Sequence, residues 1–361
     1  MSDNPKEAEE KMAKAIFISA DCWLCVFDLL PAHQLGFGIA MISHRFDYYV
    51  DEHFKTRKWA LNFIQILCKS GENGTKKMEI TNHGGEALPI PQIQMPRKVI
   101  GFQWISINYI DRNVIAFLRH FRQLFAACPI NLTIHTWSDR ILKIILRNIW
   151  PMFAKNIHGM ELLVRIFRRL RKFVPTILND CGPSLRFVNF YFDKLFTGFP
   201  CDDNAMESDG QAVAKWLFSP LQENDVPKVF KCGLDTDDGN WSSQIEAFKA
   251  AFASASSPTN FIIVFWFLPS FAASVMPFDL TNESTREQLA LKRTADFNNR
   301  FLLVRCPISR DKSKWTKWEE EAIGWDIDLQ WNRIDIEIND EDEIGDGLLD
   351  ATPGTSDQQQ K

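Results

Sequence analysis

The stretch IFISADCWLCVFDLLPAHQLGFGIAMISHRF, residues 16–46, is the part of the chain around which the rest is organised. Its first half carries apolar residues at the i, i+3 and i+4 spacing of one helix face, namely Cys22, Trp23, Val26, Phe27 and Leu30. Ser19 and Asp21 are residues that accept hydrogen bonds from the first turn of a helix, and Pro31 cannot continue one. The pattern predicts a helix of about three turns that ends at Pro31.

A second short helix is expected directly after it. Its apolar positions are Leu35, Ile39, Ile42 and Phe46. Gly36 and Gly38 leave the start of this helix loosely specified. Two short amphipathic helices bury little apolar surface by themselves, so residues 16–46 are interpreted as a docking module.

The order of residues in this module resembles the F-box motif. The matching positions are Ile18, Asp21, Cys22, Leu24, Val26, Phe27, Leu30, Leu35, Ile42, Ser43 and Phe46. The family usually begins the motif with Leu-Pro, where this chain has Ile18 and Ser19. Residues 50–66 and 301–338 also resemble a large nematode family of F-box proteins that share an associated C-terminal region.

The resemblance implies a non-catalytic function. F-box proteins dock onto a Skp-type adaptor of a cullin ubiquitin ligase and bind the target protein through the rest of the chain. The positions that it assigns to the F-box core and the adaptor-facing surface are Ile18, Trp23, Val26, Phe27, Leu30, Leu35, Ile42 and Phe46. Two alternatives stay open: a scaffold protein whose N-terminal helices cap a repeat domain, and a hydrolase built on an α/β sheet.

The composition of the 361 residues is that of a globular protein, with 45% hydrophobic and 24% charged residues and a formal net charge of -5. The cysteines are scattered, and the polar N-terminal residues contain no signal peptide, which indicates the cytosol or the nucleus. Residues 257–278 carry no charge and are long enough to span a membrane. The aromatic and β-branched run 261–268 and the nearby prolines favour a buried strand instead, so no membrane contact is expected.

Shifts in composition predict five regions. They are a disordered tail at 1–14, the F-box and a following helix at 15–66, a linker at 67–96, a substrate-binding α/β domain at 97–338, and an acidic disordered tail at 339–361.

Within the α/β domain, short apolar runs alternate with helical patterns. The expected strands are 102–110, 131–136, 159–164, 185–192, 228–234, 260–267, 301–306 and 333–338. The centres of the first four are about 27 residues apart, which is typical of a leucine-rich-repeat-like solenoid in which each unit packs on its neighbours. No run matches LxxLxLxxN, and alternation alone also fits a doubly wound sheet.

Residues with reactive side chains form no recognisable catalytic or metal-binding pattern. Cys22 and Cys25 form a CxxC inside the first predicted helix, and without a second pair they are expected to pack in the core. The chain has no HExxH, no phosphate-binding glycine motif and no GxSxG. We therefore expect no metal, no cofactor and no catalytic residue.

A basic helix face and a tryptophan-rich segment are the other prominent features. Arg165, Arg168, Arg169 and Lys172 share one helix face, which is either a solvated surface or a substrate surface for acidic or phosphorylated segments. Nucleic acid is disfavoured because the nearby aromatic residues have core spacing. The cluster of Trp315, Trp318, Trp325 and Trp331 is expected to cap the solenoid core, with an exposed binding platform as the alternative.

Overall fold

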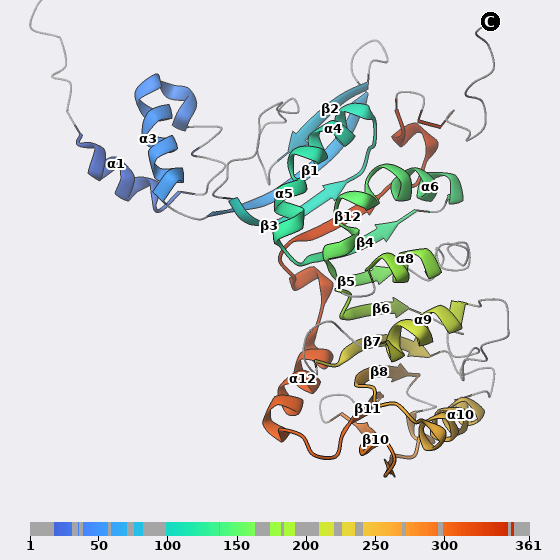
Figure 1. Cartoon of the computed structure of the whole chain (residues 1–361). Helices are drawn as coiled ribbons and strands as arrows, with labels where there is room; N and C mark the ends of the chain where they lie inside the picture. Colours follow the sequence, from blue (N-terminus) through green and yellow to red (C-terminus); the bar gives the residue numbers. More distant parts are fainter. Residues whose placement is uncertain are drawn as a thin grey trace, which may run out of the picture. The chain divides into compact units, whose positions relative to one another are not determined.

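The computed structural model of the chain describes a large part of the 361 residues (Figure 1). The described residues are 18–30, 35, 39–56, 59–70, 76–81, 99–136, 138–162, 174–181, 184–191, 209–219, 226–234, 241–268, 272–294, 299–345 and 348–349. The chain divides into two compact units. Residues 1–62 with 96–99 are called the N-terminal module here, and residues 63–95 with 100–361 are called the sheet unit.

The N-terminal module contains two α-helices and a short 3-10 helix among its described residues. They are α1 (Ala20–Phe27), η2 (Ala40–Ile42) and α3 (His44–Thr56).

A mixed α/β architecture forms the rest of the described chain. Its strands belong to a twelve-stranded sheet of order β2-β1-β3-β12-β4-β5-β6-β7-β8-β11-β10-β9. The strands are β1 (Trp59–Ser70), β2 (Lys76–Thr81), β3 (Val99–Ile107), β4 (Ile130–His135), β5 (Ile157–Leu162), β6 (Phe187–Tyr191), β7 (Lys228–Leu234), β8 (Phe261–Phe267), β9 (Phe278–Asn282), β10 (Glu287–Arg293), β11 (Arg300–Pro307) and β12 (Arg333–Glu337).

The α-helices of the sheet unit follow the strands. They are α4 (Arg112–His120), α5 (Arg122–Ala127), α6 (Asp139–Asn148), α8 (Val174–Cys181), α9 (Asp209–Phe218), α10 (Trp241–Ser254) and α12 (Lys312–Gly324). Short 3-10 helices are η4 (Trp150–Met152), η5 (Ala154–Asn156), η7 (Ile327–Leu329) and η8 (Glu341–Glu343).

The helices form where the sequence supplies both a cap and an apolar stripe. Ser138 accepts a hydrogen bond from the backbone N–H of Ile141 at the start of α6, 3.4 Å away, and Asp111 accepts one from Val114 at the start of α4, 2.8 Å away. The buried residues of these two helices then recur at three- and four-residue spacing: Val114, Ile115, Phe117 and Leu118 in α4, and Ile141, Leu142, Ile144 and Ile145 in α6.

Strands β4 to β8 are parallel neighbours in chain order, with a helix between each strand and the next. Figure 1 shows α4 to α10 along one side of the sheet. In β4, Leu132 and Ile134 alternate with Asn131 and Thr133, so successive side chains point to opposite faces of the sheet. The face that carries Leu132 and Ile134 packs under the helices, and the other face is polar in this part of the sheet.

The opposite side of the sheet is covered by the segment that leads from β11 to β12. Its helix α12 lies across from α4 to α10 (Figure 1). Trp315, Trp325 and Ile327 are buried in one apolar cluster with Phe187 of β6 and Val264 of β8. The tryptophan-rich segment is therefore mainly a cover for one sheet face, and Trp331 is its exposed member, with 57% of its surface accessible.

Strand β12 lies between β3 and β4 and is parallel to both. Asn332 directs the chain into this position with a φ of 55°, a left-handed conformation that asparagine tolerates better than most residues. Its side-chain oxygen accepts from the N–H of Phe102 at 3.0 Å, and its own N–H donates to the carbonyl of Phe102 at 2.7 Å. Strands that are about 230 residues apart in the sequence thus lie side by side inside the sheet.

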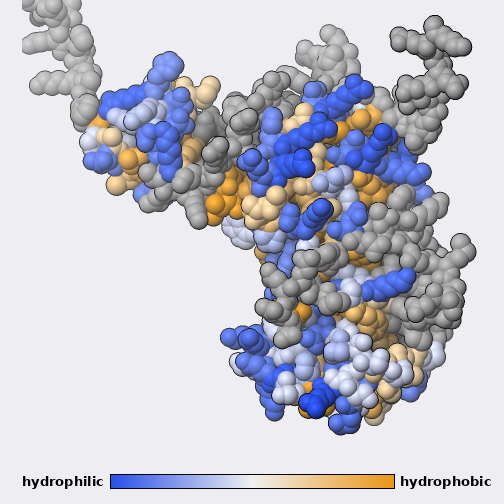
Figure 2. Space-filling view, viewed as in Figure 1, coloured by the Kyte–Doolittle hydropathy of each residue, from blue (hydrophilic) through white to orange (hydrophobic). Residues whose placement is uncertain are grey.

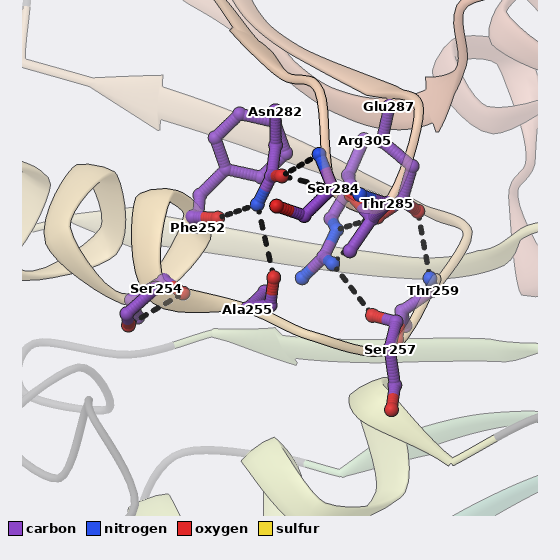
Figure 3. Close-up of polar contacts among 11 residues, drawn as sticks. Phe252, Ser254, Ala255, Ser257, Thr259, Asn282, Ser284, Thr285, Glu287 and Arg305 are labelled. Carbon is purple, nitrogen blue, oxygen red and sulfur yellow. Dashed lines mark hydrogen bonds and ion pairs between the residues drawn. The ribbon is translucent and has the colours of Figure 1, made fainter.

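Strands β9, β10 and β11 form the antiparallel edge next to β8. A buried polar network holds this edge (Figure 3). Glu287 accepts from the N–H of Thr259 at 2.7 Å and from Arg305 at 2.7 Å, and Arg305 also donates to the carbonyl of Ser257 at 3.1 Å. Asn282 donates to the carbonyl of Phe252 at the end of α10, 2.7 Å away. The hydrogen bonds of these side chains go to neighbouring elements, so the network is structural.

All eight strands predicted from the sequence are present, and α-helices lie between the successive strands from β4 to β8. The expected mixed α/β class is therefore correct. Strands and helices alternate from β4 to β8 within one twelve-stranded sheet, and the described part of the chain shows no solenoid. The predicted alternation has two exceptions. They are β12, which is inserted between β3 and β4, and the antiparallel strands β9 to β11.

Three boundaries differ from the prediction. Helix α3 ends at Thr56, and β1 occupies the positions expected to continue it, because residues 65–70 pair with 76–81 in an antiparallel hairpin that also replaces part of the expected linker. The first residues of the expected disordered tail are ordered, since Gly345 donates to the carbonyl of Ile110 at 2.9 Å and the Ile110 N–H donates to Glu343 at 3.0 Å. The expected tails at 1–14 and from 350 onward lie outside the described residues.

The uncharged stretch 257–278 contains β8, which lies between β7 and β11 in the sheet. Across the described part of the chain, we find no helix with the length and apolar character needed to cross a membrane.

Candidate functional site

Helix α1 is the first element of the predicted docking site. Ser19 caps it, because its Oγ accepts from the backbone N–H of Cys22 at 3.4 Å. The helix has eight residues and ends at Phe27, so it is shorter than the predicted three turns. Tight turn bonds follow it: Leu29 donates to the Val26 carbonyl at 3.0 Å and Leu30 to the Phe27 carbonyl at 3.2 Å. These three-residue bonds end the helix before Pro31 is reached.

The second predicted helix is divided into two elements. Ile42 belongs to the 3-10 turn η2, and Phe46 lies in the first turn of α3. Ser43 between them is extended, with φ of -165° and ψ of 160°. Its hydroxyl accepts from the N–H of Phe46 at 3.4 Å and so caps α3. Ser43 therefore starts a new helix at a position where the apolar pattern predicted one continuous helix.

The module has a small apolar core. Phe27, Leu35 and Val50 are buried, and Trp23 packs edge-on against Phe46 with ring centroids 4.7 Å apart. Leu30 packs against the same cluster. Of the eight residues predicted for the docking site, five therefore build or border the interior: Trp23, Phe27, Leu30, Leu35 and Phe46.

The other three predicted residues, Ile18, Val26 and Ile42, are exposed. Leu29 and Met41 join them, with 84% and 80% of their surface accessible, although the sequence analysis did not assign them to the site. We call Ile18, Val26, Leu29, Met41 and Ile42 the outer apolar residues. The space-filling view shows hydrophobic residues next to hydrophilic ones over α1, whereas much of α3 is hydrophilic on the face in view (Figure 2).

Spacing alone could not identify Leu29 and Met41. Each has an apolar neighbour in the chain that fits the same spacing: Leu30 packs against the core while Leu29 is exposed, and Ile42 is exposed together with Met41. Cys22 and Cys25, which were expected to pack in the core, are both exposed. They are on the same side of α1 as Val26, because residues three and four apart share a helix face. Cys22, Cys25 and Val26 therefore give this side of α1 an exposed surface of apolar and weakly polar groups.

The predicted basic substrate surface lies outside the described residues. Arg165, Arg168, Arg169 and Lys172 fall between the end of β5 and the start of α8. Their role stays a prediction.

The described residues contain no group of three or more His, Cys, Asp or Glu side chains placed to hold a metal ion. What the N-terminal module offers is a set of exposed apolar side chains on a small folded core. Such a surface suits burial against a partner protein, because large exposed apolar residues gain free energy when a partner removes them from water.

No protein-family model and no curated protein matches this chain. A comparison with solved structures aligns it with the crystal structure of the 23S rRNA methyltransferase ErmE, over 61% of this chain and 81% of that chain, at 12% identity. The TM-score is 0.14, which is too low to carry an argument about fold or function.

Proposed function

We propose that the N-terminal module docks onto a Skp-type adaptor and that the chain is a non-catalytic substrate-recognition subunit of a cullin-type ubiquitin ligase, acting in the cytosol or nucleus. The supporting resemblance is that of residues 18–46 to the F-box motif. The observation that carries the proposal is the division of the module's apolar residues. Phe27 is 1% exposed and forms the core, while Leu29, two positions later, is 84% exposed.

The sheet unit would then recruit the target protein. Its strands β4 to β8 are parallel neighbours in chain order with a helix between each strand and the next, and this repeating part of the sheet unit is the part that we propose binds the target. The proposal needs neither a cofactor nor a metal, and a cullin joins the complex only through the adaptor.

The test is direct binding between the purified full-length chain and a purified Skp-type adaptor, measured by isothermal titration. Leu29→Glu and Ile42→Glu each place a charge among the outer apolar residues without disturbing the core. Each is expected to weaken binding by tenfold or more, because charge burial in an apolar interface costs well over about 1.4 kcal/mol. Leu329→Glu changes an equally exposed residue of the sheet unit and is expected to leave the affinity unchanged.

Phe27→Ala is the control for unfolding of the module. Because it removes a core side chain, the helical circular dichroism and adaptor binding should be lost together, whereas Leu29→Glu should lose binding alone. A folded wild-type chain that does not bind the adaptor, or a Leu29→Glu variant that binds normally, would contradict the proposal and favour the scaffold alternative.

A further inference from the structure

Helices α4, α5 and α6 and the turn η5 carry basic side chains on the side that faces solvent. Residues 112–156, which contain these elements, have seven lysines or arginines and one acidic residue, Asp139, although the formal net charge of the whole chain is -5. All seven basic residues are exposed, and we call them the basic face. They are Arg112 and Arg119 in α4, Arg122 in α5, Arg140, Lys143 and Arg147 in α6, and Lys155 in η5.

The basic residues point away from the sheet because the opposite sides of their helices pack on it. In α6, Arg140, Lys143 and Arg147 recur at the spacing of one helix face, and the four buried residues of the helix lie on the other. Arg112 and Arg119 share the outer face of α4 in the same way. Both helices lie on the same side of the sheet (Figure 1), and strongly hydrophilic side chains cover them in the space-filling view (Figure 2).

Aromatic contacts join the helices beneath the basic face. The ring of Phe125 in α5 lies 5.8 Å from that of Phe121, at the junction of α4 and α5, and 5.8 Å from that of Phe153, between η4 and η5. All three phenylalanines are buried. A packed core therefore fixes the backbone positions that carry the charges, and a preorganised surface loses little conformational entropy when it binds.

Apart from Arg140, no member of the basic face forms an ion pair within the part of the chain that the structure describes. Like charges on one surface repel one another, and a partner of opposite charge relieves this repulsion. The basic face therefore favours an acidic partner.

The contacts of Arg140 show which kind of acidic group the face accepts. Its guanidinium forms an ion pair with Glu341 at 3.3 Å and donates to the carbonyl of Leu349. Glu341 belongs to η8, in the acidic run 340–343. One end of the basic face is thus occupied by a carboxylate and a backbone carbonyl from an acidic segment of the chain itself.

The other exposed residues of these helices are small or neutral. Among the described residues from 112 to 156, no aromatic or large apolar side chain is exposed. Single-stranded nucleic acids stack their bases on aromatic side chains, and helices that bind a membrane surface insert apolar ones. The composition of the face therefore favours an acidic protein segment over these two partners.

We infer that the basic face binds an acidic segment of a partner protein, rich in aspartate and glutamate, and that Glu341 of the chain competes with this segment for Arg140. Arginine binds a carboxylate through paired, charge-assisted hydrogen bonds, and five of the seven basic residues are arginines. In the proposed receptor the acidic segment would belong to the target protein, and that link alone rests on the proposed function.

The test uses fluorescence anisotropy with the full-length chain and no adaptor, so that its failure is distinct from failure of adaptor docking. The probe is a fluorescein-labelled peptide of glycine, serine and glutamate, and the matched peptide has glutamine in place of each glutamate. The glutamate peptide should bind at least about tenfold more tightly at physiological ionic strength, because hydrogen bonds between charged groups are the strong ones. Equal binding of the two peptides would overturn the inference.

A double variant of α6 locates the binding. Lys143→Gln with Arg147→Gln removes two charges from the basic face, and glutamine keeps a similar helix propensity. It should weaken glutamate-peptide binding by about five- to tenfold, because each exposed ion pair contributes modestly. Lys314→Gln with Lys317→Gln is the matched control, which removes two exposed charges from α12 on the opposite side of the sheet and should bind like wild type. Equal losses in the two double variants would reveal a response to net charge alone, contrary to the inference.

Competition for Arg140 gives a second readout of opposite sign. Glu341→Gln removes the internal carboxylate and should strengthen glutamate-peptide binding by about two- to fivefold. Glu320→Gln, at an exposed acid of α12, changes the net charge equally and should leave the affinity unchanged. Unchanged affinity in Glu341→Gln, or an equal gain in both variants, would overturn the inference.

A short DNA duplex and vesicles of phosphatidylserine test the other anionic partners. Both carry dense negative charge, so each should bind at low ionic strength and lose most of that binding at physiological ionic strength. If either one binds more tightly than the glutamate peptide at physiological ionic strength, and the α6 double variant loses that binding, the basic face serves nucleic acid or a membrane surface and the inference is wrong.

Discussion

Phe187 on β6 and Trp325, the residue directly after α12, stack with ring centroids 5.1 Å apart and planes only 6° from parallel. Asn131 of β4 donates to the carbonyl of Trp331 at 2.9 Å farther along the same segment. The chain between β11 and β12 is therefore attached to the sheet at separate points, on β6 and on β4.

The first prediction concerns this cover. Trp325→Ala should lower the free energy of unfolding by about 3–5 kcal/mol, because a large buried aromatic side chain is replaced by a cavity. Urea denaturation followed by circular dichroism measures the change. Trp331→Ala is the matched control, since Trp331 is exposed, and should change stability by less than about 0.5 kcal/mol. Similar losses in both variants would contradict the packing described for α12.

The second prediction tests how closely the cover approaches the sheet. A Cβ at Gly159 would lie 2.4 Å from Oδ1 of Asn131 and 2.6 Å from the ring of Trp325. Gly159→Ala should therefore destabilise the protein by about 1–3 kcal/mol through overpacking. Gly324→Ala, at the last residue of α12, meets no atom within 4 Å and should be neutral or stabilising by about 0.5–1 kcal/mol. Thermal melts of the two variants compare them directly.

The third prediction concerns the buried ion pair of the antiparallel edge. Arg305 and Glu287 are 4% and 1% exposed in their side chains. Arg305→Met leaves the carboxylate buried without its cation and should cost about 3–5 kcal/mol. Adding Glu287→Gln should recover much of this loss, because the neutral amide can still accept from Thr259. A double-mutant cycle in urea measures the coupling, and additive losses would argue against it.

A partly exposed pair provides the control for that cycle. Lys292 on β10 and Glu319 on α12 form an ion pair in which the lysine side chain is 46% exposed. Lys292→Met should change the free energy of unfolding by less than about 1 kcal/mol.

The fourth prediction is a pH dependence. Burial lowers the pKa of Lys228 from 10.5 to about 8. Its ammonium lies against the carbonyl of Trp216 and 2.6 Å from Oγ of Ser219, at the end of α9. Between pH 8 and 10.5 the unfolded chain holds the proton that the folded chain has lost, so the contribution of Lys228 to stability rises with pH in this window. The slope is on the order of 1 kcal/mol per pH unit.

The comparison with Lys228→Met isolates this contribution. Buried Cys232 has a pKa well above 9.0 in the fold, and its thiol contributes with the opposite sign above that pH. Wild type should therefore gain stability relative to Lys228→Met from pH 8 to 10.5, whatever the total slope. Lys317→Met, on the exposed side of α12, should run parallel to wild type. Parallel lines for both variants would contradict the prediction.

The strands that were predicted from sequence are those whose residues are mostly apolar and β-branched, such as FIIVFWF at 261–267. The strands that were missed, β9 with FDLTN and β10 with EQLALKR, mix charged and polar residues because they lie at an edge with fewer covered faces. At 59–66 the apolar spacing fitted a helix as well as a strand, and pairing with distant residues decided the outcome.

Register explains what could not be predicted at the polar face. Thr133, Glu161, Asn189 and Lys231 each belong to a predicted strand, in which successive side chains point to opposite faces of the sheet. The sequence therefore indicates which residues of each strand share a face with them. Their alignment depends on how each strand slides against the next, and a shift of one residue would have turned a side chain to the other face. The insertion of β12, which adds Asp335, has no local signal at all.

The position of β12 also has a consequence for how the chain is made. Phe102 bonds Asn332, which is 230 residues away, and these contacts belong to the middle of the sheet rather than to its edge. Until a ribosome has released residue 337, β3 and β4 each keep an open strand edge that can pair with another chain. Contacts so distant in sequence slow folding. We expect nascent chains to need chaperone protection until β12 has been synthesised, and a truncation directly before Arg333 to aggregate although it removes less than a tenth of the 361 residues.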